Sequence, residues 1–546
     1  MFKLQLLHAS DLEGGVDAID NAPNFAAIVD AFETSARADD IASILLSGGD
    51  NYIPGPFFNA GAAPSLEPTY EGFYNQFFGL IDTGVLAAST DDTNGDGFFD
   101  NDEIEAAIDA RPITFDDVYV KDVNGDGVPD YFEEIDLDPG RIDIAILNRL
   151  GLDASAVGNH EFDAGPGGLD AAINYESEEG NTLSDGRFGT VNFLQEVDSP
   201  GAQFPYLSAN LDVEADGDLA EIFTDAILTS DAFRSDLAGA RVDPDDPAAT
   251  GADGRDDKLA PATIITRDGE QIGVVGATTQ VVASISSTGD VDALNPGAND
   301  MAALAGVLQP VIDDLLGQGV DKIILTTHLQ QIALEEELAG RLSGVDIILA
   351  GGSDTLLADD TDRLRPGDAA DATYPLTVEG ADGSPTLVVS TPGEYGYVGR
   401  LVVGFDDAGE LVTTTDADGD TVVDIDPAES GVFATDAEGV EAVTGAPSVA
   451  DAIAGSELAS DVQKLAEAVT DVVTELDGDV AGETEVFLDG RRESVRTEET
   501  NLGNLTADAN LAAARASDPE VAVSIKNGGG IRAPIGEIVD TGAGDA

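Results

Sequence analysis

Short apolar runs alternate with polar turns and helical patterns along most of the chain. Near the N-terminus, an apolar run at 4–7, a helical pattern at 24–32 and a second apolar run at 41–46 follow one another. The same rhythm recurs at 142–158, 271–279, 302–317, 322–328 and 345–351. Strands that alternate with helices in this way are typical of layered sheets with helical covers, so the pattern predicts an α/β fold.

Two stretches rich in Asp and Gly, at about 59–139 and 212–257, break this rhythm and are interpreted as insertions. A helical pattern at 454–476 leads into the turn Asp477-Gly478-Asp479, which we interpret as a domain boundary. Because 546 residues exceed the size that a single core usually reaches, at least two domains are expected. We predict a first domain over 1–450, a helical linker over 451–480 and a second domain over 481–546.

The balance of charges changes this picture. The chain carries 107 acidic and 24 basic residues, a net charge of −83, beside a hydrophobic fraction of 42%. The hydrophobic fraction supports folded domains, whereas repulsion of this size favours a salt-rich or calcium-rich setting. Nucleic acid and anionic membranes are disfavoured as partners, because both attract clustered Lys and Arg. No apolar run approaches the length of a membrane span, and the absence of cysteine excludes disulfides and thiolate metal sites.

The few basic residues are unevenly distributed. Six of the 24 fall within the 42 residues from 491 to 532, where an even spread would place about two. This end of the chain is therefore the expected anion pocket.

Five polar blocks each follow an apolar strand, at 8–13, 49–51, 158–161, 326–328 and 351–355. The carboxyl ends of parallel strands share one edge of a sheet, where ligands of such folds bind. Asp, Asn, Glu and His gathered at that edge supply oxygen ligands and imidazole, which is what a pair of divalent cations needs.

The order and wording of these blocks, with Gly158-Asn159-His160-Glu161-Phe162-Asp163 at the centre, resemble the calcineurin-like metallophosphoesterases of the 5′-nucleotidase and UDP-sugar hydrolase family. The resemblance implies a four-layer α/β/β/α metallophosphatase sandwich. It also implies that 481–546 is the N-terminal part of the family's C-terminal α/β substrate domain, truncated at Ala546. By position it implies six metal ligands: Asp11, Glu13 and Asp354 on a first ion, Asp50 between two ions, and Asn159 and His328 on a second.

Three positions depart from the family pattern. Glu13 stands where the family usually has His, Asp354 where it has His or Gln, and Gly352 where it has a metal-binding His. The resulting oxygen-rich site favours magnesium or manganese over zinc. Gly352 leaves the second ion one ligand short, and water, substrate or Ser353 are the candidates for that place.

Two further residues of the central motif are expected to be catalytic without binding metal. By resemblance His160, paired with Asp163, stabilises the transition state or protonates the leaving oxygen, while the carboxylate orients the ring. His8 lies within a strand end and is interpreted as a packing residue.

Near the C-terminus, the runs 495–505 and 527–532 resemble the opening of the family's substrate domain. The resemblance implies phosphate contacts from Arg496 and Arg532, whose forked side chains suit phosphate, and a base or sugar contact from Asn527 beside Gly529. A glycine turn with solvated arginines is the alternative interpretation. The chain ends before the two aromatic residues with which the family sandwiches the base.

The first insertion carries two EF-hand-like loops. Their acidic and amide residues have the spacing of calcium ligands, with Gly at the sixth place and Glu at the twelfth. Solvated acidic turns are the alternative. The predicted calcium ligands are Asp92, Asn94, Asp96, Asp100 and Glu103 in one loop and Asp122, Asn124, Asp126, Asp130 and Glu133 in the other.

These observations predict a phosphoric-ester hydrolase, most simply a 5′-nucleotidase or related nucleotide phosphohydrolase that uses a metal-bridging hydroxide and acts in nucleotide catabolism. The alternatives are a catalytically weak calcium-binding surface module on the same scaffold, or a UDP-sugar or cyclic-nucleotide hydrolase. We expect an extracellular or cell-surface location reached by leaderless export, because the apolar run at 1–7 is too short for a signal peptide. A cytoplasmic protein of a halophile is the alternative, and the sequence does not indicate an oligomeric state.

Overall fold

The computed structural model of the chain describes residues 1–87, 90–111, 118–121, 132, 135, 137–177, 197–234, 257–294, 298–416, 421–477, 484–531 and 534–535. The chain divides into two compact units, Met1–Thr474 and Glu475–Ala546. The first unit contains two seven-stranded sheets, and the described part of the second contains a 17-residue helix, a one-turn helix and loops.

The first sheet has the strand order β20-β17-β1-β2-β3-β6-β9. Neighbouring strands from β1 to β9 are parallel, while β17 is antiparallel to both β1 and β20. The strands are β1 (Phe2–Ala9), β2 (Ala42–Ser47), β3 (Ala154–Ala156), β6 (Tyr206–Leu207), β9 (Leu259–Ala260), β17 (Tyr397–Phe405) and β20 (Gly431–Ala434).

The second sheet has the order β15-β16-β14-β13-β11-β10-β8. Strands β16, β14, β13 and β11 run parallel, β15 and β10 are antiparallel to their neighbours β16 and β11, and β8 is parallel to β10. The strands are β8 (Leu228–Thr229), β10 (Ala262–Arg267), β11 (Glu270–Thr278), β13 (Ile323–His328), β14 (Ile347–Gly351), β15 (Leu376–Glu379) and β16 (Pro385–Val389).

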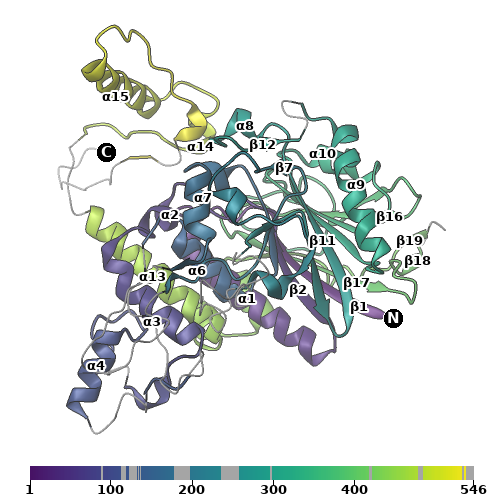
Figure 1. Cartoon of the computed structure of the whole chain (residues 1–546), viewed down its shortest axis with the longest axis horizontal. Helices are drawn as coiled ribbons and strands as arrows, with labels where there is room; N and C mark the ends of the chain where they lie inside the picture. Colours follow the sequence, from purple (N-terminus) through teal and green to yellow (C-terminus); the bar gives the residue numbers. More distant parts are fainter. Residues whose placement is uncertain are drawn as a thin grey trace, which may run out of the picture. The chain divides into compact units, whose positions relative to one another are not determined.

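The two sheets face each other across a shared apolar core. Leu4 and Leu6 of β1 and Ile44 of β2 belong to the same buried cluster as Ile324 of β13 and Leu349 of β14. Helices α9 (Met301–Gly317) and α10 (Ile332–Ala339) cover the outer face of the second sheet, whereas α1 (Ala18–Ala38), α6 (Arg141–Leu150) and α7 (Pro166–Ile173) cover that of the first (Figure 1). This arrangement confirms the expected four-layer α/β/β/α architecture.

Helix α1 is longer than its sequence pattern suggests. The pattern indicates a helix from 24, just after Pro23, because proline lacks the N–H that a helix interior uses. The helix instead begins at Ala18 and continues through Pro23. Burial of Ala22, Phe25 and Ile28 against the sheet outweighs the lost hydrogen bond.

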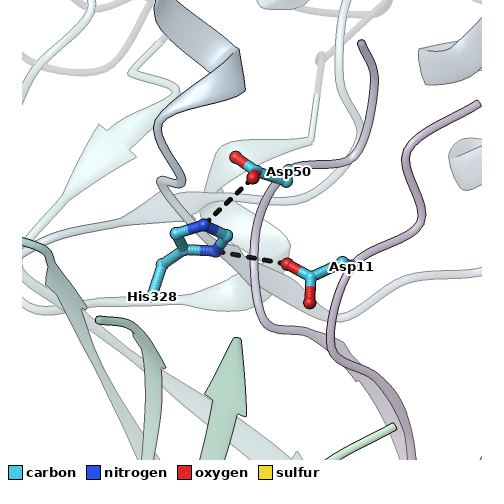
Figure 2. A group of neighbouring side chains, drawn as sticks. All are labelled: Asp11, Asp50 and His328. Carbon is cyan, nitrogen blue, oxygen red and sulfur yellow. Dashed lines mark ion pairs between the residues drawn. The ribbon is translucent and has the colours of Figure 1, made fainter. Parts of the chain in front are cut away.

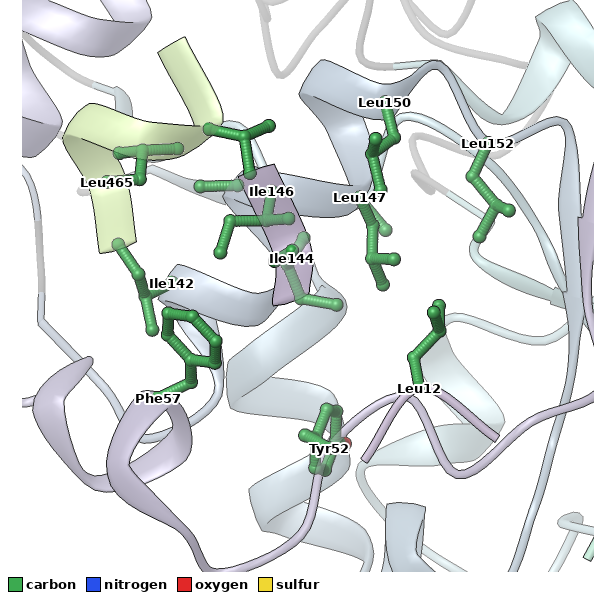
Figure 3. Packing of buried hydrophobic residues seen from close by; sticks show 14 of the residues in the cluster. Leu12, Tyr52, Phe57, Ile142, Ile144, Ile146, Leu147, Leu150, Leu152 and Leu465 are labelled. Carbon is green, nitrogen blue, oxygen red and sulfur yellow. The ribbon is translucent and has the colours of Figure 1, made fainter. Parts of the chain in front are cut away.

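Helix α13 (Glu457–Asp477) packs its apolar face into the core of the first unit. Val462, Leu465 and Val469 are buried at three- and four-residue spacing, as expected for one face of a helix. Figure 3 shows Leu465 beside Ile142 and Ile146 of α6. Truncation of a buried Leu of this kind costs roughly 2–5 kcal/mol, so α13 contributes substantially to the stability of the unit.

Smaller apolar clusters and shorter elements complete the described part of the chain. In the first insertion, Phe99, Ile104 and Tyr119 belong to a small separate apolar cluster. In the second unit, Val495, Leu502 and Ile531 form another. No described helix is both long and apolar enough to cross a bilayer. The remaining helices are α2 (Pro56–Ala60), α3 (Glu67–Phe77), α4 (Asn101–Ala110), α8 (Val282–Ile285), α11 (Ala437–Thr444), α12 (Val449–Ala454), α14 (Arg492–Val495) and α15 (Asn501–Ser517), and the remaining strands pair as β4 (Glu176–Ser177) with β5 (Val197–Ser199), β7 (Leu211–Asp212) with β12 (Asp292–Ala293), and β18 (Thr413–Thr415) with β19 (Thr421–Val423).

Candidate metal centre

The predicted site lies where the carboxyl ends of both sheets meet. Asp11, Asp50 and Asn159 follow β1, β2 and β3 of the first sheet, and His328 ends β13 of the second. The sheets are joined at this edge, because the Thr326 hydroxyl donates to the carbonyl of Ser47 at 2.7 Å. Loops from both sheets therefore face one common space.

Asp11, Asp50 and His328 form a buried cluster whose ligand atoms all lie within 4.8 Å of one another. The His328 ring lies between the two carboxylates (Figure 2). Its Nε2 is 3.0 Å from Asp50 Oδ2, and its Nδ1 is 3.6 Å from Asp11 Oδ1 and 2.9 Å from the carbonyl of Gly48. The structure thus brings together three of the six predicted metal ligands at coordination-like spacing.

The buried carboxylates of this cluster would be stabilised by a nearby positive charge. Burial raises the pKa of Asp11 well above its usual value, and the charges of Asp50, Asp354 and Glu13 add to the rise. Burial alone would lower the pKa of His328, but the charge of Asp50 and its hydrogen bond outweigh burial and raise it to about 10. Asp11 Oδ2 is buried and has no hydrogen-bond partner among the described residues. A divalent cation would satisfy these oxygens, so the donor set fits the metal ions that the family pattern implies.

The other three predicted ligands lie around this cluster. Asn159 Oδ1 is 3.2 Å from His328 Nε2, and Asn159 is buried. Glu13 donates its backbone N–H to the carbonyl of Asp50 at 2.8 Å, and Glu13 and Asp354 both act electrostatically on Asp11. Asn159 therefore lies beside His328, whereas Glu13 and Asp354 lie close enough to Asp11 to raise its pKa.

The loops of the site are held in an uncommon backbone conformation. Among the described residues, eight non-glycine residues have positive φ, and four of them are Glu13 (61°), Asp50 (46°), Asp354 (52°) and Gln330 (74°). Such conformations cost on the order of 1 kcal/mol or more and concentrate at functional sites. Three of these four residues are predicted ligands, and the fourth, Gln330, was not singled out from the sequence.

His160 and Asp163 form the predicted pair at the more exposed side of the cluster. His160 Nδ1 lies 2.5 Å from Asp163 Oδ2, and His160 Nε2 lies 3.9 Å from Asp50 Oδ2. The backbone N–H of His160 also donates to Asp50 Oδ1 at 2.7 Å. The ring is therefore oriented by a carboxylate on one side and faces the Asp50 carboxylate with its other nitrogen.

Glu161, to which sequence reasoning assigned no role, connects two loops of the site. Its Oε2 accepts from the backbone N–H groups of Asp50 (3.0 Å) and Gly158 (2.8 Å), and its Oε1 accepts from that of Asn51 (2.9 Å). Burial, aided by the charge of Asp50, raises the pKa of Glu161 to about 7. Its place inside the central motif was the only signal in the sequence, because backbone partners cannot be identified from residue types.

Glu335 has a similar role on the other sheet. This fully buried residue accepts from the Leu329 N–H at 3.2 Å, directly after His328. It lies on α10, seven residues beyond His328, and no pattern in the sequence connects the two. His8, in contrast, packs against Tyr374, with 2.9 Å between its Nε2 and the Tyr374 hydroxyl.

The structure describes some of the predicted substrate and calcium residues. In the second unit, Arg496 and Asn527 are exposed, and a Cβ atom on Gly528 would lie 2.1 Å from the Val495 carbonyl, so the two predicted runs approach closely. Arg532 lies outside the described residues, as do the five predicted ligands of the second calcium loop (Asp122, Asn124, Asp126, Asp130 and Glu133). The first calcium loop, Asp92 to Glu103, is described and immediately precedes and enters α4.

Comparisons with known proteins find nucleotide phosphoesterases among the similar sequences and structures. The chain is 29% identical over 400 residues to the trifunctional nucleotide phosphoesterase protein YfkN of Bacillus subtilis, covering 72% of this chain and 21% of YfkN. It is 28% identical over 403 residues to the 5′-nucleotidase of Bos taurus, covering 72% of this chain and 52% of the relative. The crystal structure of a 5′-nucleotidase precursor from Thermus thermophilus aligns with a TM-score of 0.49 at 21% identity, covering 98% of this chain and 72% of that one. No family model matches the chain.

The fold is a mixed α/β sandwich with a buried cluster of potential metal ligands at one edge of its two sheets. Over 72% of its length the chain is similar in sequence to 5′-nucleotidases and to a nucleotide phosphoesterase. It spans about half the length of the bovine relative (52%) and about a fifth of YfkN (21%).

Proposed function

We propose that this protein hydrolyses phosphoric monoesters, with nucleoside 5′-monophosphates as the preferred class. The observation that carries the proposal is the buried cluster of Asp11, Asp50 and His328 with the His160–Asp163 pair beside it. The relatives point the same way, since they are named 5′-nucleotidase and nucleotide phosphoesterase.

Each residue has a chemical task in this proposal. Asp11, Asp50 and His328 would hold divalent ions, which when bound would activate water and neutralise phosphoryl charge. His160 Nε2 delivers a proton to the leaving oxygen or stabilises the charge that develops in the transition state. Asp163 holds the ring through Nδ1, so that Nε2 points toward the site. Arg496, Arg532 and Asn527, beside Gly529, are proposed to bind the phosphate and the nucleoside.

The donor set also bears on the identity of the ions. The predicted ligands offer four carboxylates, one amide and one imidazole (Asp11, Glu13, Asp50, Asp354, Asn159 and His328). Oxygen-rich sites select magnesium or manganese, whereas zinc prefers more nitrogen or sulfur. We therefore propose two magnesium or manganese ions.

The test uses the full 546-residue chain. AMP, UDP-glucose, a cyclic nucleotide and p-nitrophenyl phosphate are assayed with magnesium, manganese, calcium or zinc, for wild type and Asp50→Asn. We expect release of phosphate from AMP with manganese or magnesium, and a loss of at least about 100-fold in Asp50→Asn. Absence of turnover with every metal and substrate would refute the proposal, whereas preference for UDP-glucose or the cyclic nucleotide would reassign the substrate.

We also propose that the loop from Asp92 to Glu103 binds calcium. Glu103 is 4% exposed, and its Oε2 is buried without a hydrogen-bond partner among the described residues. Its Oε1 accepts from the backbone of Thr93 and Asn94, so the carboxylate reaches back into the loop. Gly97 has φ +83°, as the sharp turn of such loops requires.

The loop is also tied to the core. Phe98 is 1% exposed within the main apolar cluster, and Lys464 Nζ of α13 lies 4.6 Å from its ring centroid. Asp100 caps α4 by accepting from the Glu103 N–H at 2.9 Å. Calcium at this loop would therefore stabilise the packing of the insertion on the first unit.

Thermal unfolding with and without calcium tests this second proposal. Saturating calcium at about 100 times its Kd is expected to stabilise the fold by about 2.7 kcal/mol for each occupied loop, and Glu103→Gln should abolish the share of the first loop. Asp102→Asn is the matched control, because Asp102 is exposed on the same helix turn and lies outside the ligand spacing. An unchanged Tm in wild type would identify the loop as an acidic turn. The second loop is proposed to bind calcium by the same sequence pattern.

The location is proposed to be extracellular or at the cell surface. The net charge of −83 and the proposed calcium loops support it, because calcium is abundant outside cells. A calcium Kd far below the micromolar range would instead indicate a cytosolic protein, for which a salt-rich cytoplasm would explain the acidic composition.

A further inference from the structure

One residue at the metal centre was not identified from the sequence pattern. Gln330 lies two residues after His328, in the loop between β13 and α10. Its side chain enters the site, with the carboxamide Nε2 at 2.5 Å from Asn159 Oδ1 and 2.9 Å from His328 Nε2. Asn159 and His328 are the two residues that are expected to hold the second ion.

Gln330 fills the space that Gly352 leaves open. A Cβ atom on Gly352 would lie 2.7 Å from Gln330 Nε2 and 2.7 Å from His328 Nε2. A side chain at position 352 would thus point to the same place that the Gln330 carboxamide occupies. Position 352 is where the family pattern has a metal-binding His, so one side chain has replaced another in the same volume.

The spacing of the three donor groups suits one ion. The Gln330 carboxamide nitrogen, Asn159 Oδ1 and His328 Nε2 are separated by 2.5, 2.9 and 3.2 Å. Adjacent ligands of an ion with bonds of about 2.1 Å lie about 3 Å apart. The two ends of a carboxamide are nearly isosteric, so rotation of the group presents Oε1 where Nε2 now lies.

The backbone of Gln330 supports a functional role. Its φ of +74° is unusual for a residue with a long side chain, which has no local polar contact to favour the left-handed region. Ser353, the other protein candidate for the vacant ligand place, donates its hydroxyl to Thr355 Oγ1 at 2.8 Å instead. Glycine at position 330 would adopt this positive φ without strain, so the presence of glutamine there indicates that its side chain is needed.

We propose that Gln330 is a ligand of the second divalent ion, through Oε1, and replaces the histidine that Gly352 lacks. This inference rests on the proposed metal centre and deepens it. Because a neutral amide oxygen replaces an imidazole, the second ion is bound more weakly than the first and prefers manganese or magnesium to zinc.

Manganese binding to the full chain tests the proposal by calorimetry, with electron paramagnetic resonance to detect a coupled pair of ions. The protein with an otherwise intact sequence should bind two ions at this centre, counted in a Glu103→Gln plus Glu133→Gln background so that neither insertion loop contributes. Gln330→Gly should weaken the second ion at least about tenfold while leaving the first unchanged. Its metal-free Tm should not fall, because glycine relieves the positive φ.

Two further variants distinguish a ligand from a packing residue. Gln330→Glu should hold the second ion at least as tightly as wild type, since a carboxylate is a good ligand for hard cations but cannot donate to Asn159 Oδ1. Gln331→Gly is the matched control, because Gln331 is the exposed neighbour and makes no side-chain capping bond. It should bind both ions normally.

Two wild-type-like ions in Gln330→Gly, or loss of the second ion in both Gln330→Gly and Gln330→Glu, would overturn the proposal. Wild type with a single ion would overturn it as well. Absence of any bound ion in wild type would instead overturn the metal centre itself, and with it the proposed hydrolase function.

Discussion

Nδ1 of His160 lies 2.5 Å from Oδ2 of Asp163, while Nε2 of the same ring faces Asp50 at 3.9 Å. A carboxylate at Nδ1 fixes the tautomer and orientation of an imidazole. The orientation of the ring is therefore already fixed with Nε2 available to a leaving oxygen.

This relationship predicts the behaviour of His160→Ala. With AMP as substrate, kcat should fall by about 100- to 10,000-fold, the usual contribution of a positioned acid. With p-nitrophenyl phosphate the loss should be smaller, because p-nitrophenolate leaves without a proton. Manganese binding measured by calorimetry should stay within about twofold of wild type, since His160 is not a ligand. Equal losses of kcat for both substrates would contradict a role of His160 as general acid. The remaining role would then be stabilisation of the charge that develops in the transition state.

Glu161→Gln is expected to loosen the metal centre. The carboxylate accepts three backbone N–H bonds from Asp50, Asn51 and Gly158, and a glutamine amide nitrogen cannot accept. At least one buried N–H loses its partner, at a cost of about 1–3 kcal/mol. Thermal unfolding should show a lower Tm, and manganese titration a weaker affinity. Wild-type values in both measurements would show that Glu161 does not hold these loops.

Asp346 predicts a pH dependence of stability away from the metal centre. Burial raises its pKa to about 8, and its Oδ2 accepts from the Ile323 N–H at 2.8 Å. Because the folded pKa exceeds the unfolded value of about 3.9, the folded state binds more protons between the two, and stability falls as pH rises through this window. Asp346→Asn keeps an acceptor oxygen and should flatten the decline between pH 5 and 8.

Chemical denaturation at several pH values measures this effect. Asp346→Asn should become more stable than wild type by a few kcal/mol at pH 8 and should differ little at pH 4. Asp290→Asn, at an exposed position, serves as the control for removing one charge from a highly acidic chain. Parallel pH profiles for wild type and Asp346→Asn would contradict the prediction.

Salt should stabilise the whole protein. The net charge of −83 makes the folded chain repel itself, and the screening length falls from about 10 Å at 0.1 M salt to about 3 Å at 1 M. Tm should rise steadily with sodium chloride, and it should do so equally in Glu103→Gln with a chelator present. A Tm that does not change with sodium chloride would contradict stabilisation by screening.

Much of the fold could be predicted from the chain because its strands are short, apolar and followed by polar turns. β2 was predicted as 41–46 and is Ala42–Ser47, and α9 was predicted as 302–317 and is Met301–Gly317. Helix α1 was harder, because burial on the sheet overrides the local cost of Pro23. The pairing of β17 with β1 joins residues almost 400 positions apart, and no local pattern carries that information.

The sequence by itself determined the chemistry of the candidate centre: carboxylates and few imidazoles at strand ends, a His160–Asp163 pair, and a missing histidine at Gly352. Only the tertiary structure decided which side chain enters the space beside Gly352, and which buried carboxylates, Glu161 and Glu335, hold the loops. The physical reason is that Gln330 reaches Asn159 and His328 only because two different sheets meet at one edge and the backbone at Gln330 adopts a positive φ. Residue types limit the chemistry available, and three-dimensional packing determines which atoms meet.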